Sequence, residues 1–303
     1  MLDIKKIQSK NECTIVGILN ELDIVEGKTS DGRDYIRGTA TIRVDQEVKG
    51  KQVENLIPVS MFAMRLKKDG SQNSIYDKIA DYKESLTSAA AAETISQASR
   101  VSVVGKTANL VENMWVDKRT GAVKTGFQIS SNFINSARES DKDAAKFEVT
   151  GVVLGMRPEQ DKEGEETGRL IVNIGLVGYA GKVDVIETIA EDNAKSFIED
   201  NWNKSDTVTV AGIINMTQKV TTYTEEVGFG EPIVRHRTES CRELLITAGS
   251  REGADEDHAY DEDDIKAALK ERQAKKEALL NKSKSKSKPA AKSTSEKDDS
   301  FGF

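Results

Sequence analysis

Cysteine and histidine are scarce in this sequence. Its 303 residues include 2 Cys and 2 His. Cys13 and Cys241 lie far apart and outside any Cys-x-x-Cys pair, so neither a disulfide framework nor a zinc site is indicated. With only His236 and His258 available, histidine catalysis and metal binding both have few candidate side chains.

Long hydrophobic runs are also missing. No segment approaches the roughly 18 consecutive apolar residues that a membrane-spanning helix needs. Residues 1–11 contain lysines but no apolar segment of the kind found in secretory signals. Hydrophobic residues make up 37% of the chain and charged residues 31%, which allows real cores but leaves part of the chain too polar to pack. We therefore expect a soluble, cytoplasmic protein.

Charge is distributed unevenly along the chain. Residues 1–140 carry 20 Lys and Arg against 18 Asp and Glu, residues 141–250 carry 12 against 20, and residues 251–303 carry 12 against 13. The length predicts about two domains of ordinary size. We therefore expect one domain over 1–140, a second, acidic domain over 141–250, and a charged C-terminal segment over 251–303.

The two halves of the chain repeat one pattern of predicted elements. In each half, three β-rich segments are followed by a segment with helical spacing and then by two further β-rich segments. These segments lie at 14–22, 35–44, 55–63, 75–86, 101–105 and 127–134, and again at 149–156, 169–177, 182–189, 194–202, 208–212 and 242–247.

Three strands, one helix and two strands is the order of the OB-fold, a five-stranded Greek-key barrel. Glycines inside the predicted strands suit the bends and bulges of a small barrel, and these are Gly17, Gly38, Gly105, Gly151 and Gly212. A pair of β-sandwich domains is the alternative, but one helix at the same place in both halves argues against it. We predict a mainly β protein with two tandem OB-fold barrels, followed by a C-terminal helix and a disordered tail.

Cations and aromatic residues gather in the first half, on the strands and loops that bind oligonucleotides or oligosaccharides in OB-folds. Together they can track phosphates and stack bases. The candidate DNA-binding residues are Lys28, Arg33, Tyr35, Arg37, Arg43, Phe62, Arg65, Trp115, Lys118, Arg119 and Lys124. Tyr35 and Arg37 share a face by the two-residue period of a strand. The alternatives are that Trp115 caps the barrel, that Phe62 belongs to the core, and that the lysines are ordinary surface.

The loops of the two halves differ in charge and in turn signals. The turn signal Asp-Lys-Arg-Thr-Gly at 117–121 predicts a hairpin finger that carries Trp115 and Lys124. In the second half, the loop at 160–167 is acidic and would repel phosphate. The polar segment 218–240 contains basic, aromatic and acidic residues. Three interpretations of it stay open, which are a second, weaker contact with a nucleic-acid strand, a protein interface and an ordinary β-hairpin.

The C-terminal segment begins with four acids at 261–264 and continues as a predicted helix over 265–280, with bases later in the helix as its dipole favours. A Ser/Lys/Ala linker over 281–296 leads to the tip Asp298-Asp-Ser-Phe-Gly-Phe303. With tandem barrels over 12–250 and this tip over 298–303, the chain resembles the single-stranded DNA-binding proteins of bacteria and their phages. Their barrels precede a disordered tail with an acidic tip and a terminal Phe.

That family normally carries one barrel per chain, so the resemblance is closer to a phage-encoded member, which would act in the host cytoplasm. The resemblance implies that Asp298, Asp299, Phe301 and Phe303 recruit replication or recombination proteins. Two features depart from the pattern: Gly302 precedes the last Phe, and the tip has only two acids.

Catalysis is not expected. Gly105-Lys106-Thr107 lacks the glycine that a phosphate-binding loop needs five residues earlier, where Arg100 stands. The predicted function is binding and protection of single-stranded DNA during phage replication, recombination or repair, with no metal or cofactor. The alternatives are a protein-interaction scaffold of a replication or virion assembly, favoured by the acidic second half, and a single-stranded RNA-binding protein.

Overall fold

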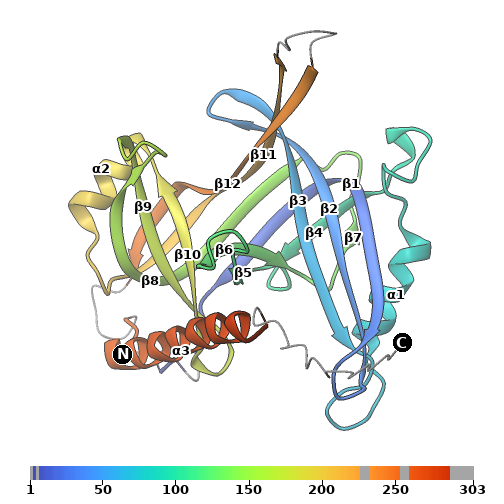
Figure 1. Cartoon of the computed structure of the whole chain (residues 1–303), viewed down its shortest axis with the longest axis horizontal. Coiled ribbons are helices and arrows are strands. Elements are labelled where there is room, and N and C mark those ends of the chain that lie inside the picture. Colours follow the sequence, from blue (N-terminus) through green and yellow to red (C-terminus); the bar gives the residue numbers. More distant parts are fainter. Residues whose placement is uncertain (1–2, 5–6, 226–232, 253–258, 287–303) are drawn as a thin grey trace, which may run out of the picture.

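The computed structural model describes residues 3–4, 7–225, 233–252 and 259–286 (Figure 1). The protein is mainly β, as predicted. The first unit contains β1 (Asn11–Lys28), β2 (Asp34–Val48), β3 (Lys51–Met64), α1 (Ser74–Ser85), η1 (Ile95–Gln97), β4 (Arg100–Gly105), β5 (Asn109–Val116), β6 (Val123–Ser130) and β7 (Asn135–Ser136). The second unit contains β8 (Ala144–Gln160), β9 (Glu166–Val177), η2 (Tyr179–Gly181), β10 (Val183–Ala190), α2 (Asp192–Asn201), β11 (Thr207–Glu225) and β12 (Ile233–Glu252), and α3 (Glu262–Lys286) follows.

The strands of each unit close into a ring. In the first unit, β1 pairs antiparallel with β2 and with β4, and β2 pairs antiparallel with β3. The ring closes where β3 pairs in parallel with β6, which forms a hairpin with β5, the continuation of β4. The second unit repeats this order: β8 pairs with β9 and β11, β9 with β10, β10 in parallel with β12, and β12 with β11.

Alternation along the strands builds the core of each ring. On β2, Ile36, Ala40, Ile42 and Val44 are fully buried, while Arg37, Thr39, Thr41 and Arg43 alternate with this inward face. The helix α1 is capped at its N-terminus by Asn73, whose side chain accepts the N–H of Ile75, and it buries Tyr76, Ile79 and Tyr82 against the barrel. The predicted helices over 75–86 and 194–202 are thus confirmed as α1 and α2.

Strands run further than their sequence segments predicted. The predicted loop at 23–34 is mostly strand, because β1 and β2 pair as far as Lys28 and Asp34. The polar segment 218–240 likewise forms the β11–β12 hairpin, whose pairing runs out to Glu225 and Ile233 (Figure 1). The helix α3 extends to Lys286, six residues beyond its predicted end. The tip with Asp298, Asp299, Phe301 and Phe303 lies outside the described residues.

Glycine is required where two strands approach closely. A Cβ on Gly17 would lie 2.1 Å from the carbonyl oxygen of Arg43, and one on Gly212 would lie 1.9 Å from the carbonyl oxygen of Leu245. A close approach of the neighbouring strand thus requires glycine at both positions, and Gly212 also stands at a register shift of the β11–β12 pairing, as the predicted role in bulges expects. Gly105 has a different role, because it has a φ of +69° and nothing within 4 Å of its Cβ position.

We expect Gly212→Ala to lower the free energy of unfolding by about 1–3 kcal/mol or more, since the clashing atom is backbone and cannot turn away. Urea denaturation of the full chain measures this. Gly155→Ala is the matched control, because Gly155 is also a strand glycine but a Cβ there meets nothing within 4 Å. Equal stability of the two variants would contradict the close approach.

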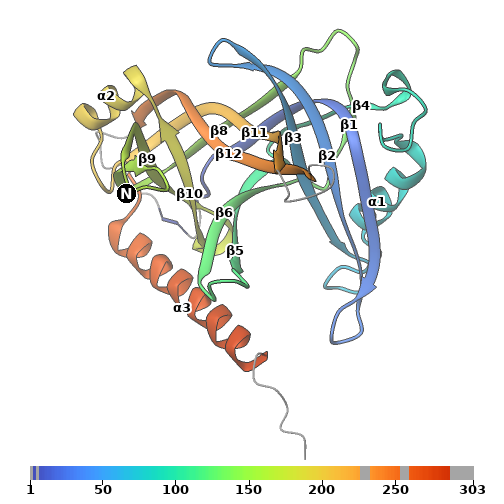
Figure 2. The ribbon, with the colours of Figure 1, turned by 45° about the horizontal axis from the view of Figure 1, so that its top comes forward.

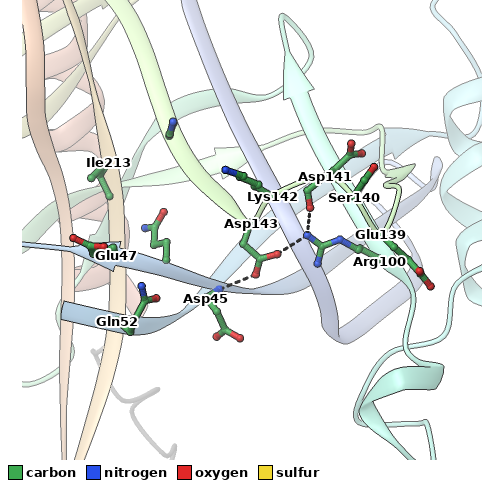
Figure 3. Close-up of a pocket in the computed structure, with 12 residues that line it drawn as sticks. Asp45, Glu47, Gln52, Arg100, Glu139, Ser140, Asp141, Lys142, Asp143 and Ile213 are labelled. Carbon is green, nitrogen blue, oxygen red and sulfur yellow. Dashed lines mark hydrogen bonds and ion pairs between the residues drawn. The ribbon is translucent and has the colours of Figure 1, made fainter. Parts of the chain in front are cut away.

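The two units share one continuous sheet. Residues 11–16 of β1 pair antiparallel with residues 144–149 of β8. A second link joins β3 to β11, where the fully buried Asn55 accepts the N–H of Met216 at 2.7 Å. The segment between the units is fastened by Arg100, which contacts Asp143 at 2.5 Å and the carbonyl of Asp141 (Figure 3). The units are therefore held together by backbone pairing as well as side chains.

The helix α3 packs on both units. Its first turn is capped by Asp261, which accepts the N–H groups of Asp263 and Asp264 at 2.9 and 3.0 Å. Ile265 and Ala268 are buried in a cluster with Val152, Val177 and Val183 of the second unit. Further along, Arg272 forms a two-bond ion pair with Glu112 of β5, and the Nε–Oε2 distance is 2.8 Å. In the described part of the chain, no helix has the length and apolar composition needed to cross a bilayer.

Candidate nucleic-acid interface

An aromatic pair stands on the outer face of β2 and β3. The rings of Tyr35 and Phe62 lie 5.7 Å apart at an interplanar angle of 30°. The Phe62 side chain is 52% exposed, so the alternative that it belongs to the core is wrong. Its backbone is fixed, because the Phe62 N–H donates to Oδ1 of Asn132 at 2.9 Å. An exposed ring on a paired strand is a rigid surface on which a base can stack.

Arg37 lies directly across from Phe62 in the β2–β3 register. It is exposed, and among the described residues it makes no ion pair. On its other side, Val25 of β1 pairs with Arg37 and is 44% exposed. Sequence reasoning missed Val25, although its outward position follows from the alternation along β1. The centre of this face thus combines an exposed guanidinium with apolar surface.

A basic cleft adjoins the aromatic pair. It is a cavity of about 650 Å³ between the β1–β2 loop and the segment after β3, lined by Gly32, Arg33, Asp34, Met64, Arg65, Leu66, Lys67, Lys68 and Gly70. Lys28 and Arg65 contact the carboxylate of Asp34 at 3.4 and 3.7 Å, and Arg33 pairs with Asp31 at 2.7 Å. All three cations are well exposed, so these pairs are weak and leave the cations available to phosphate.

The predicted hairpin finger is confirmed as β5, β6 and their turn. Trp115 pairs across the hairpin with Lys124 and is 43% exposed, and its ring lies over Gly126. Asp117 holds the turn, since its carboxylate accepts the N–H of Arg119 at 2.8 Å and contacts Nζ of Lys124 at 2.5 Å. The bond from Lys124, with the backbone donors of the turn, lowers the pKa of Asp117 to about 2. Lys118 and Arg119 are exposed at the tip.

The finger and the aromatic pair share the outer surface of the first barrel. Ser60, two residues before Phe62, lies beside Ser130 in the β3–β6 pairing. Counting back by twos from Ser130 along β6 reaches Lys124, whose cross-strand partner is Trp115. A nucleic-acid strand that crosses this surface from the basic cleft would therefore contact Phe62 first and Trp115 later.

Arg43 differs from the other predicted site residues. Its guanidinium contacts Asp45 at 2.9 Å and Glu54 at 3.0 Å, and its side chain is 29% exposed. These two carboxylates raise its pKa, the bond from Asp45 most. Arg43 therefore stands on the outer face but is neutralised within the protein. Nothing in the sequence near Arg43 indicates that Glu54, which lies opposite Asp45 on the next strand, contacts its guanidinium.

The corresponding face of the second unit is covered. Ile171 of β9 and Ile189 of β10 stand opposite each other and are buried, packed with Val48 from the β2–β3 hairpin of the first unit. Lys49 of that hairpin contacts Glu191 at 2.7 Å. The other end of the face, at Val177 and Val183, lies under α3. Unlike the β2–β3 face, this surface is therefore packed at both ends, by Val48 at one and by α3 at the other.

A further cavity lies between the units (Figure 3). It measures about 550 Å³ and is lined by Asp45, Gln46, Glu47, Gln52, Arg100, Glu139, Ser140, Asp141, Lys142, Asp143, Lys146 and Ile213. The carboxylate of Asp143 is already engaged, because it accepts the N–H of Asp45 at 2.9 Å and pairs with Arg100. Acids outnumber bases in this lining, so the cavity does not attract phosphate.

Comparison with known proteins gives a family. A model of the YorF family matches residues 10–285, and the chain therefore belongs to the YorF family. No curated protein sequence matches it.

Two solved structures of the single-stranded DNA-binding protein from Thermus aquaticus are similar to the chain over most of its length. A deletion mutant of that protein has a TM-score of 0.49 and 14% identity, with 82% of this chain and 97% of that chain covered. The wild-type protein has a TM-score of 0.47 and 14% identity, with 84% and 98% covered. At this identity, the assignment of site residues rests on the geometry of this chain alone.

Proposed function

We propose that both units are OB-folds and that the first unit binds single-stranded DNA without catalysis. The closed order β1-β2-β3-β6-β5, with a helix between the third and fourth strands, supports the fold assignment. The binding proposal rests on one observation above the rest. Phe62 is 52% exposed beside Tyr35 and Arg37, which makes no ion pair with the described residues, on the face that OB-folds use for oligonucleotides.

The second unit supports this assignment by contrast. Its equivalent face is filled by Val48 and by α3, and residues 141–250 carry more acids than bases. The burial of Ile171 and Ile189 stabilises the protein only while Val48 covers them. A ligand that displaced Val48 would therefore expose apolar surface to water. We therefore propose that the first unit binds single-stranded DNA and that the second unit has a supporting role.

The biological setting belongs to the same proposal. A protein of this kind protects single strands during phage DNA replication, recombination or repair, and recruits partner proteins through Asp298, Asp299, Phe301 and Phe303. This part rests on the resemblance of the sequence to phage and bacterial single-stranded DNA-binding proteins. A protein-interaction scaffold is the second candidate, and the acidic second unit favours it.

Fluorescence titration of the full chain with oligo-dT, an RNA of equal length and a duplex tests the function. We expect single strands to bind more tightly than duplex, because stacking needs an unpaired base. Affinity should fall with salt, with a log-log slope near −0.7 for each phosphate contacted, or about −3.5 for five contacts. If the chain does not bind oligo-dT at low salt, the protein-interaction scaffold is the remaining candidate function. If it binds RNA more tightly than DNA, the ligand is single-stranded RNA instead.

A further inference from the structure

An apolar pocket lies between α2 and the last part of β12. It is a cavity of about 350 Å³, and its walls include Ala194, Phe197, Ile198, Trp202, Ile246 and Gly249. Phe197 is 50% exposed, whereas Trp202 is 2% exposed. A pocket of this size with a mainly apolar lining is typical of sites that take an apolar group. Figures 1 and 2 show α2 at the end of the molecule opposite α1, away from β2 and β3.

The first unit fills the corresponding place with its own chain. The parallel pairs that close the two rings put Ile129 of β6 and Leu245 of β12 at equivalent positions. Shortly after Ile129 comes the buried Ile134, whose N–H donates to the Tyr82 hydroxyl of α1 at 2.8 Å. After Leu245 and its neighbour, residues 247–249 are Thr, Ala and Gly. The second unit thus has small residues where the first unit places an isoleucine against its helix.

Trp202 carries a buried polar group without a partner. Its indole N–H is buried and has no hydrogen-bond acceptor among the described residues. A Cβ on Gly249 would lie 3.0 Å from the Trp202 ring, so a residue without a side chain suits the position beside it. Buried donors are nearly always paired in folded proteins, and an unpaired one indicates a group that is missing from the site.

The rim of the pocket is acidic. Residues 192–202 contain three acids and one lysine. Asp192, Glu199 and Asp200 are exposed, and no ion pair joins them to any residue that the structure describes. Lys195 donates to the carbonyl of Gly168 at 3.1 Å. Because Asp200 follows Phe197 by three residues, the two side chains are neighbours on the helix surface. Basic groups are therefore favoured beside the pocket.

We infer that this pocket binds a peptide segment of a partner protein, with an apolar side chain that enters the pocket and basic residues that flank it. The segment Phe133-Ile134 of the first unit shows which kind of group occupies the corresponding place. The exposed acids of α2 select bases beside that group, and the half-exposed Phe197 provides an aromatic contact at the mouth. The inference goes beyond DNA binding by the first unit and does not depend on it.

The probe is an acetylated peptide, Lys-Lys-Asn-Phe-Ile-Lys, which places bases around the sequence of residues 132–134. The chain has two tryptophans, so the fluorescence of the full-length Trp115→Phe variant reports on Trp202. We expect a saturable change in this fluorescence, with an affinity that falls as salt screens the charges. A peptide with Glu in place of Lys, and one with Ala in place of Phe and Ile, should each bind at least about 5-fold more weakly.

In the same background, Phe197→Ala should weaken binding of the basic peptide by about 2- to 10-fold, because an aromatic contact is lost. Tyr179→Ala is the matched control, since Tyr179 is an exposed aromatic residue of the second unit that does not line the pocket. This control should leave the affinity for the peptide unchanged. Asp200→Lys should weaken binding of the basic peptide and strengthen binding of the acidic one.

The inference is overturned if the basic peptide causes no fluorescence change, or if the Glu and Ala peptides bind equally well. Equal affinities of the Phe197→Ala variant and the Tyr179→Ala control would also overturn it. Light scattering tests another occupant: if Phe197→Ala converts a dimer into a monomer, a second copy of the chain fills the pocket and the partner peptide is wrong. If the chain binds the peptide but not oligo-dT, this inference stands and the proposed function alone fails.

Discussion

Replacing Phe62 with alanine is expected to weaken binding of oligo-dT by roughly 5- to 150-fold, which corresponds to the 1–3 kcal/mol that base stacking on an aromatic ring contributes. The ring is 52% exposed and its neighbour Tyr35 is tilted against it, so the substitution removes stacking surface and little core packing. The thermal midpoint should therefore stay close to that of the wild-type chain. Fluorescence titration and thermal denaturation of the same sample measure the two quantities.

The chain offers a matched control for this substitution. Phe197 on α2 is 50% exposed, but it lies on the second unit, outside the proposed path of the strand. Phe197→Ala removes the same side chain at nearly the same exposure and should leave affinity unchanged. If both variants lose affinity equally, binding is a general property of the surface. If Phe62→Ala loses stability and keeps its affinity, the aromatic pair is structural and the proposed face is misplaced.

Replacing Tyr82 with alanine is expected to lower the free energy of unfolding by about 3–5 kcal/mol, the usual effect of deleting a buried aromatic side chain. Tyr82 is 2% exposed and joins α1 to the barrel. Its hydroxyl accepts the N–H of Ile134 at 2.8 Å and donates to the carbonyl of Asn132 at 3.4 Å. The variant therefore loses packing and two hydrogen bonds together, which urea denaturation of the full chain records.

Two further variants separate these contributions. Tyr82→Phe keeps the ring but leaves the N–H of Ile134 unpaired, and we expect a loss of about 1–3 kcal/mol. Tyr179→Ala is the control for removing a tyrosine, since Tyr179 is 79% exposed, and it should change stability by less than about 0.5 kcal/mol. A Tyr82→Ala variant as stable as Tyr179→Ala would mean that α1 contributes little to the barrel.

The order of the elements was predictable from the sequence. Alternating apolar residues identify β2 and β3, helical spacing identifies α1 and α2, and the turn signal at 117–121 identifies the finger. These are local properties, because periodicity and turn chemistry depend on neighbours within a few residues. The repeat of one pattern in both halves then indicated two related units. Strand ends were less predictable, since β11 and β12 continue through a polar segment that only cross-strand pairing makes regular.

Only the tertiary structure decided which candidate side chains remain free. The two-residue period places Tyr35, Arg37 and Arg43 on one face, but it does not reveal that Glu54 neutralises Arg43 while Arg37 keeps an open position. Likewise, Phe62 and Ile189 occupy similar places in the two repeats, and the first is exposed while the second lies under Val48. Coverage of a face depends on contacts between residues more than a hundred positions apart. Local sequence carries no record of such contacts, so the sequence determined the strands and their faces, and the packing of the two units determined which face is open.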